Sequence, residues 1–200
     1  YTVKKLSASA IASLRDKALD DQEVRAAYLA EYEEAEGTQN FLNALQNYPE
    51  LKGMQTNLYK CFIPRAWMAG NENAVSGFLH PEGIYDDPKG GKFRQEVYKR
   101  LRAHFQFHNE LRLFPEVHHV TVFSINIYSK ITAHPQFNHI ANLYLAQTID
   151  HCFEHSGVGA VPGIKDENGK WNIQGHRERI IHADEEVLSL FAALYDGVGT

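Results

Sequence analysis

The sequence predicts an α/β fold in which a small mixed sheet of about three strands is surrounded by several helices. Residues 120–128 alternate between apolar and polar side chains, which is typical of a strand with one buried face. A segment with helical periodicity, residues 92–104, separates the apolar runs 74–79 and 105–113, as in a strand–helix–strand crossover. The order of these segments is typical of the later half of a nucleotide-binding sheet.

The first part of the chain predicts helices. Residues 7–35 have frequent alanines and apolar residues near helical spacing, and Gly37 is expected to end this helix. Thr38 can cap a second helix, which Pro49 closes. We therefore expect two helices before residue 50.

The next segments change from helix to strand. Residues 54–69 predict a third helix, and Pro64 inside it predicts a kink or a break. The run 74–79 predicts a strand, followed by a polar loop over residues 82–91 and the helix 92–104.

Two further strands, 105–113 and 120–128, are expected to form an antiparallel, hairpin-like pair around a turn at Phe114-Pro115. Residues 130–140 predict a loop, and residues 141–155 predict an amphipathic helix.

The last part of the chain predicts a loop, a short strand and a helix. Residues 157–175 are rich in glycine and polar residues, and Trp171 is expected to pin this loop. A short extended piece, residues 179–182, precedes a helix that begins at Ala183 or Asp184. Acidic residues in the first turn of this helix suit its dipole.

The charge of the chain is unevenly distributed. The net charge of −5 does not by itself indicate a nucleic-acid-binding protein, but residues 89–102 are basic whereas residues 16–36 are acidic. Ligands of open α/β sheets bind at the carboxyl ends of strands, so Lys89, Lys92 and Arg94 are expected to border a cleft after the strand 74–79. A solvated helix face explains the same charge run equally well.

Several histidines are further candidates for binding. His118 and His119 follow the Phe114 corner and are weak candidates for phosphate contacts, the alternative being a polar loop. His104 and His108 flank the strand before this corner, and an edge strand is the alternative to an equally weak role in phosphate contacts.

The cysteines and the absence of membrane and signal segments indicate a cellular location, and the ends of the chain indicate its relation to a longer protein. Cys61 and Cys152 form no CxxC pair, no apolar run is long enough to span a bilayer, and no signal-peptide pattern is present. We therefore expect a cytoplasmic location. The start at Tyr1 without methionine and the stop at Gly199-Thr200 suggest a segment of a longer protein.

One formal metal motif is present. His151, Glu154 and His155 match the H-x-x-E-H pattern of inverted zinc proteases. Both histidines are expected to lie opposite the apolar stripe of their helix, and a solvated pair is the preferred interpretation. We expect no metal. No serine nucleophile elbow, Walker loop or GxGxxG motif is present.

Four strings carry a resemblance to a known family: EYEEAEGTQNFLNALQNYPELKGMQTNLYKCFIP, GFLHPEGIYDDPKGG, HFQFHNELRLFPEVHHVTVFSINIYS and GHRERIIHADEEVLSLFAALYD. Together they cover most of the chain. They resemble the large bacterial adenine-specific DNA methyltransferases, in particular type IIG restriction–modification enzymes and related phage-defence enzymes.

The resemblance implies a fragment of an S-adenosylmethionine-dependent enzyme that methylates the exocyclic amine of adenine in double-stranded DNA. Such enzymes flip the target base into a pocket. The family's glycine-rich cofactor motif and its Asn-Pro-Pro-aromatic catalytic loop are both absent, so we expect no catalytic residue in this fragment and no tight cofactor binding. The fragment itself is expected to be inactive.

The resemblance also assigns regions and a base pocket. Residues 1–70 would be a helical segment, residues 71–129 the later strands of a Rossmann-like methyltransferase sheet, and residues 130–200 a helical and loop extension. Phe114 would stack on the flipped base, and Pro81 would end a central strand at the same pocket. Packing of Phe114 as an ordinary core residue at a turn is the equal alternative. The partners would be DNA and the remainder of the parent chain.

Two other functions remain open from the sequence. The chain could be a stand-alone DNA- or protein-binding module without catalysis, in which case Lys92 and Arg94 would carry the binding. A zinc hydrolase using His151, Glu154 and His155 is the weaker alternative.

Overall fold

The computed structural model describes residues 6–55 and 57–195 and divides into two compact units, residues 1–49 and 50–200. Tyr1 and the Gly199-Thr200 end lie outside the described residues, as does Thr56 within the expected third helix. The two units are described separately below.

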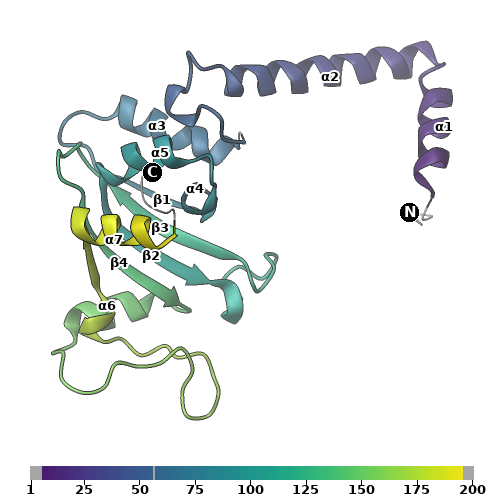
Figure 1. Ribbon diagram of the computed structural model, residues 1–200. Coiled ribbons are helices and arrows are strands. Elements are labelled where there is room, and N and C mark those ends of the chain that lie inside the picture. The colour runs from purple at the N-terminus through teal and green to yellow at the C-terminus, as the bar shows by residue number, and fades with distance from the viewer. Residues whose placement is uncertain (1–5, 56, 196–200) are drawn as a thin grey trace. The chain divides into compact units, whose positions relative to one another are not determined.

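The first unit contains two helices, α1 (Ala8–Ala18) and α2 (Gln22–Asn43), shown in Figure 1. The Ser7 hydroxyl accepts a hydrogen bond from the backbone of Ala10, and the Asp21 carboxylate accepts two at the start of α2. Asp21 therefore begins a new helix where one continuous helix was expected.

The expected stop at Gly37 is wrong, because α2 continues through Gly37 and Thr38 to Asn43. A glycine inside a helix costs only about 1 kcal/mol relative to alanine, which the other residues of a 22-residue helix offset. No residue of α1 or α2 is buried.

The second unit is built on a five-stranded mixed sheet in the order β1-β3-β2-β4-β5 (Figure 1). Strand β3 is antiparallel to both of its neighbours, β4 is parallel to β2, and β5 is antiparallel to β4. The α/β class is confirmed, with five strands rather than about three. The strands are β1 (Ser76–Pro81), β2 (Leu101–His108), β3 (Val122–Tyr128), β4 (Gln136–Leu143) and β5 (Ile181–Asp184).

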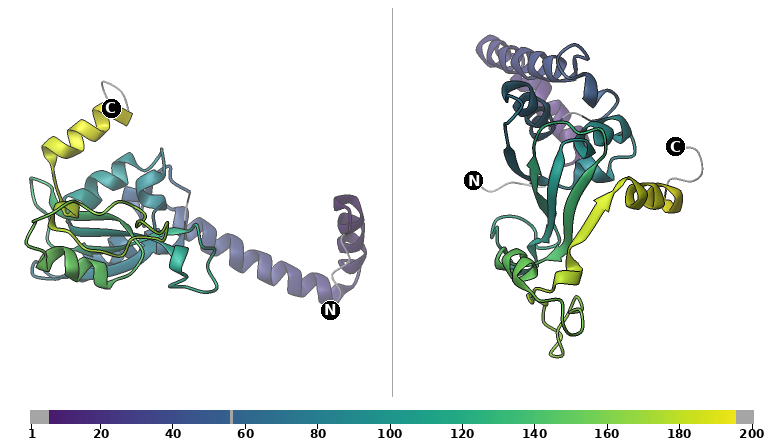
Figure 2. Two further views of the ribbon diagram at one scale, coloured as in Figure 1. Left: turned by 90° about the horizontal axis from the view of Figure 1, so that it is seen from below. Right: turned by 90° about the vertical axis from the view of Figure 1, so that its left-hand side faces the viewer.

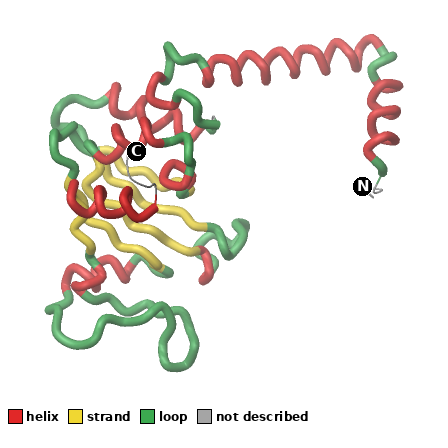
Figure 3. The backbone as a smooth tube through the Cα atoms, in the orientation of Figure 1, coloured by secondary structure: helices red, strands yellow, loops and turns green. Residues whose placement is uncertain are grey.

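Helices pack on both faces of this sheet (Figure 3). Three of them, α3, α4 and α5, lie on one face, and α6 lies on the other, as the side-chain contacts below show. The helical elements are the 3-10 turn Pro49–Leu51, α3 (Leu58–Ala69), α4 (Gly83–Asp86), α5 (Gly91–Tyr98), the 3-10 turns Asn109–Leu111 and Arg177–Arg179, α6 (Gln147–Glu154) and α7 (Glu185–Tyr195).

The alternation of β3 produces two chemically different faces, as the sequence predicted. Ser124, Asn126 and Tyr128 are fully buried on the face that we call the polar face. The rings of Tyr128 and Phe93 lie 5.7 and 5.9 Å from Trp67 of α3. Helices α3 and α5 therefore cover the polar face.

The opposite face, the apolar face, holds a hydrophobic cluster around α6. Phe107 and Phe123 stack with ring centroids 5.4 Å apart, and Cys152 of α6 packs against them with Ile140 and Leu143. Burial of these side chains is the main stabilising term on this side of the sheet.

Two expectations for the region after β3 are wrong. Residues 136–143, divided between an expected loop and an expected helix, form β4, and α6 begins only at Gln147. Parallel pairing with β2 decides this structure, and such a distant partner leaves no local signal in the sequence.

Three boundaries before β3 also differ. Helix α3 begins at Leu58, capped by Asn57, and continues through Pro64 without a break. The expected loop 82–91 contains α4, and Leu101, expected in a helix, opens β2. Predicted helix boundaries are imprecise because an apolar residue suits the buried face of a helix as well as that of a strand.

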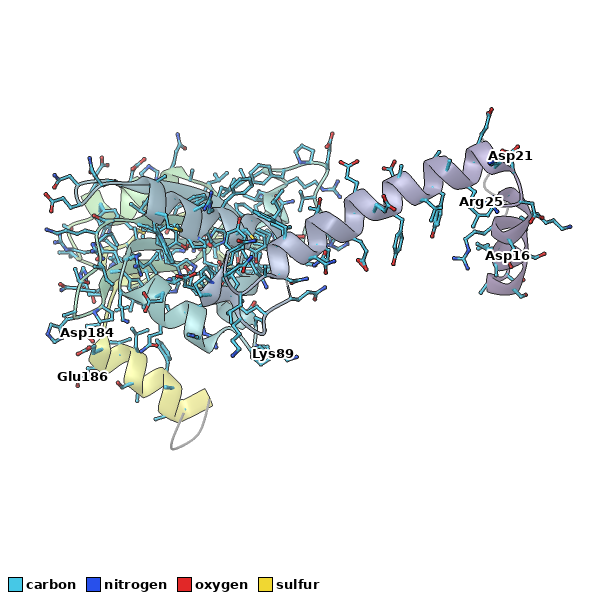
Figure 4. All side chains as sticks on the ribbon, turned by 90° about the horizontal axis from the view of Figure 1, so that it is seen from above. Asp16, Asp21, Arg25, Lys89, Asp184 and Glu186 are labelled. Atoms are coloured by element: carbon cyan, nitrogen blue, oxygen red, sulfur yellow. The ribbon has the colours of Figure 1, made fainter. Side chains whose placement is uncertain are left out.

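A short strand followed by a helix was predicted near the end of the chain and is present, but the strand is 181–184 rather than 179–182 and the helix begins at Glu185. The Asp184 carboxylate accepts a hydrogen bond from the backbone of Val187 at the start of α7, where Figure 4 shows Asp184 and Glu186. Trp171 pins the long loop by stacking on Tyr144 with centroids 4.9 Å apart. Among the described residues, no helix is both long and apolar enough to cross a membrane.

Two glycine substitutions test this description of the backbone. Gly37→Ala should stabilise α2 by about 1 kcal/mol, because a methyl group at this position meets nothing within 4 Å. Gly53→Ala, the control, should destabilise its unit by about 1–2 kcal/mol because Gly53 has a φ of +87°. Thermal unfolding followed by circular dichroism at 222 nm measures both. A loss of helix signal in Gly37→Ala would contradict a continuous α2.

Candidate functional site

A buried carboxylate lies directly after β1. Glu82 is 6% exposed, and its oxygens accept hydrogen bonds from Nε2 of His104 at 3.1 Å and Nε2 of Gln106 at 3.0 Å. Both donors belong to β2, and the hydroxyl of Ser124 on β3 is a further donor. Glu82 thus joins the end of β1 to two other strands.

Aromatic and imidazole rings stack around this carboxylate. The His104 ring lies 4.8 Å from that of His139 on β4 and 4.4 Å from that of Tyr85 on α4. The Tyr85 hydroxyl donates to Oδ1 of Asn126 at 2.6 Å. We call Glu82, Tyr85, His104, Gln106 and His139 the Glu82 cluster.

Electrostatics fix the charge states within the Glu82 cluster. Burial opposes ionisation of Glu82, but hydrogen bonds from His104, Ser124 and Gln106 prevail and lower its pKa to about 2. Burial, together with repulsion from His104, lowers the pKa of His139 to about 4. At neutral pH the structure therefore holds a carboxylate at Glu82 and an uncharged imidazole at His139.

A pocket of about 540 Å³ opens beside the Glu82 cluster. Its polar wall contains Glu82, His104, Gln106 and His139. Strand β5 and helix α7 supply the apolar wall, and Figure 2 shows α7 standing off the sheet after β5.

The two predicted base-pocket residues, Pro81 and Phe114, both neighbour Phe123 on the other face of the sheet. Pro81 ends β1, which is the outermost strand of the described sheet and not the central strand that was expected. Pro81 pairs with Phe123 in the β1–β3 register, and the Phe114 ring packs edge-on against Phe123 with centroids 5.1 Å apart. Phe114 remains 39% exposed. We call Pro81, Phe114 and Phe123 the aromatic corner.

A buried asparagine holds the aromatic corner in place. Asn109, which is fully buried, accepts a hydrogen bond from the backbone N–H of Phe114 at 3.0 Å. Its amide donates to the carbonyls of Phe114 and Val117 at 2.9 Å each. Because these bonds use backbone atoms, the corner conformation does not depend on the Phe114 side chain.

The predicted DNA-contacting cations are not equivalent. Lys89 and Lys92 are exposed, and Figure 4 shows Lys89 at the surface. Arg94 is partly buried and donates to the carbonyl oxygens of Asp87 at 2.6 Å and Ile84 at 3.4 Å. The Arg94 guanidinium thus holds the α4–α5 connection.

His118 and His119 lie in the exposed loop before β3. Their rings are 4.7 Å apart, and Nδ1 of His119 lies 3.2 Å from Oε2 of Glu110. The backbone N–H of Val120 donates to Nδ1 of His118 at 3.4 Å.

The residues of the zinc motif do not converge. Helix α6 ends at Glu154, and Nδ1 of His155 accepts a hydrogen bond from the backbone N–H of Gly157. The His155 ring lies 4.2 Å from that of His176. Within the described ranges, no group of three or more His, Cys, Asp or Glu side chains is placed to hold a metal ion.

Comparison of the chain with protein-family models found no match, and comparison with the curated proteins found none either. Function is therefore argued from the geometry.

Sequence reasoning missed the Glu82 cluster. His104 was expected on an edge strand, whereas β2 lies between β3 and β4. The available signal was the spacing of His104 and Gln106, two residues apart on a strand and hence on one face.

The two pKa shifts predict loss of stability in acid. Between about pH 6.5 and 4 the unfolded chain binds a proton at His139 that the folded chain does not. The free energy of unfolding should therefore decrease as the pH is lowered through this range. Between about pH 4.5 and 2 Glu82 acts in the same direction, contributing on the order of 3 kcal/mol. Urea unfolding across this range measures both steps.

Two substitutions identify the residues that cause the decrease in unfolding free energy in each pH range. His139→Gln should reduce the step between pH 6.5 and 4, to which His80 also contributes because burial lowers its pKa. Glu82→Gln should reduce the lower step, which Glu82 shares with Asp87 and Glu96, whose pKa values are also lowered. An unchanged upper step in His139→Gln would contradict the assignment.

Proposed function

We propose that this chain is part of an S-adenosylmethionine-dependent DNA methyltransferase that modifies the exocyclic amine of adenine, in a restriction–modification or phage-defence system. The observation that carries the proposal is the aromatic corner. Phe123 brings Pro81 and Phe114, which are 33 residues apart in the sequence, to the carboxyl ends of β1 and β2. In open α/β sheets, ligands bind at this edge.

The strand order also supports the proposal. Strands β1 and β2 run in the same direction, and β3 lies between them in the opposite direction. Helices α4 and α5 connect the two parallel strands. A helical connection between two parallel strands of one sheet is the unit from which open α/β sheets are built.

Phe114 would supply the stacking surface for a base flipped out of the duplex. Stacking is worth about 1–3 kcal/mol per base. The half-exposed ring is held from behind by Phe123, and its backbone is held by Asn109, so the surface is formed before the base arrives. This pre-organisation limits the entropy lost on binding.

Exposed cations would contact the DNA backbone beside this corner. Lys89 and Lys92 are free to approach phosphates, whereas Arg94 is already engaged by backbone carbonyls. Neutralising phosphates gives affinity without sequence specificity.

The methyl donor would be held elsewhere in the parent protein. The chain contains neither a glycine-rich cofactor loop nor an Asn-Pro-Pro-aromatic motif, so its residues do not fit S-adenosylmethionine. The role of this chain in the reaction is to hold and orient the base.

Substitution of Phe114 in the intact parent protein tests the proposal. Phe114→Ala should lower methyl transfer to adenine about tenfold or more, because the stacking energy of the flipped base is lost. The measurement is incorporation of labelled methyl groups into duplex DNA that lacks methyladenine. Phe114→Tyr should retain activity, since a tyrosine ring also stacks.

Phe62→Ala is the matched control, because Phe62 is an exposed aromatic residue of α3 and is 54% exposed. It should leave methyl transfer unchanged. Equal activities of Phe114→Ala and the unmodified enzyme would refute a base-stacking role for Phe114.

A further inference from the structure

The pocket beside the Glu82 cluster has the size and lining of a small-molecule site. Its volume of about 540 Å³ falls within the roughly 300–1,000 Å³ typical of ligand pockets. Apolar side chains from three elements, Phe137 of β4, Ala183 of β5 and Leu188 of α7, face a few polar groups on β2 and β4. This combination of a mostly apolar wall with a few fixed polar groups is how small molecules are oriented.

One of these polar groups is a fixed hydrogen-bond acceptor. Nδ1 of His139 lies 3.2 Å from the backbone oxygen of His104, which can only accept, so Nδ1 carries the proton. The ring is uncharged at neutral pH, and its lone pair is therefore on Nε2. Nε2 makes no hydrogen bond within the described part of the chain.

The buried carboxylate of the polar wall is already engaged within the protein. Both oxygens of Glu82 already accept hydrogen bonds from His104 and Gln106. A carboxylate with this many donors holds the cluster rigid. Nε2 of His139 is thus an unused acceptor on the polar wall, in addition to the exposed carboxylate of Asp86.

The charges at the pocket exclude anionic ligands. The described lining contains two carboxylates, Glu82 and Asp86, and neither lysine nor arginine. A phosphate group placed there would be repelled and left without a donor of opposite charge. The lining therefore disfavours a ligand that carries an anion at this end.

We propose that this pocket binds an uncharged, planar nitrogen heterocycle of base-to-nucleoside size, whose N–H or amino group donates to Nε2 of His139. Aromatic side chains at the pocket, Tyr98, Phe137 and Phe191, supply the apolar surface against which a flat ring packs. A hydrogen bond to Nε2 of His139 would give the ring its orientation.

This site is separate from the aromatic corner. His104 and Gln106 share the polar face of the sheet with Ser124, whereas Pro81 pairs with Phe123, whose side chain lies on the apolar face. A ligand in the pocket would not occupy the position of the flipped base. The proposal of a ligand in this pocket is therefore independent of the proposed function.

Calorimetric titration of the full chain with three probes tests the proposal. Adenosine should bind. N6,N6-dimethyladenosine, which lacks the amino donor, and adenosine 5′-monophosphate, which adds the anion, should each bind about tenfold more weakly. Equal affinity for the dimethylated probe, or no binding of adenosine at millimolar concentration, would overturn the proposal.

Variants locate the acceptor. His139→Leu should weaken adenosine binding about tenfold, and His139→Gln, which restores an acceptor, should recover most of it. The control is His182→Leu, because His182 is exposed on the neighbouring β5 and bonds Asn138 away from the pocket. Urea unfolding of each variant establishes that it is folded. A His182→Leu variant that loses as much affinity as a folded His139→Leu would refute the assignment.

Discussion

The buried carboxylate of Glu82 is the interaction on which the arrangement of the second unit depends. Strands β1 and β2 are not neighbours, since β3 separates them, yet hydrogen bonds from His104 and Gln106 to Glu82 connect the end of β1 directly to β2. Removing the donors would leave an unpaired buried charge. The resulting loss of folding free energy would exceed the stabilisation that the intact hydrogen-bonded pair provides. The relative position of the two carboxyl ends is therefore fixed, and with it the distance between Pro81 and the turn that carries Phe114.

The sheet keeps two kinds of chemistry apart because its side chains alternate. Its polar face buries Ser124, Asn126 and Tyr128 under α3, α4 and α5, and every hydrogen bond formed there is strengthened by the absence of water. Its apolar face is held by burial alone and ends in the aromatic corner. A rigid, hydrogen-bonded face thus supports a stacking surface on the face behind it, so that a base-sized ring would meet a preformed site.

The sequence predicted elements whose structure is decided locally and missed those decided by distant pairing. The alternation of residues 122–128 and the cap at Asp184 required no partner to be recognised. Strand β4 is defined by its ladder with β2, more than 30 residues away, and was expected as loop and helix. The same distinction holds at the site. Phe114 and Pro81 were selected through the family resemblance and their role stays a prediction, whereas the convergence of Glu82, His104 and His139 follows from strand register alone.

The connection between β1 and β2 explains how cations and stacking surface come to share one edge. Strand β1 ends at Pro81, and only the short α4 separates it from the start of α5, so Lys89 and Lys92 must lie near the carboxyl end of β1. Arg94 keeps this connection compact by binding its carbonyl oxygens, and for this reason it is not available to phosphate. Arginine and lysine differ here for a chemical reason. The guanidinium has several donors and suits fixed carbonyl oxygens, whereas the lysine ammonium is a mobile point charge suited to a phosphate backbone. The basic segment is therefore part scaffold and part exposed cationic surface, a distinction that its charge pattern alone does not contain.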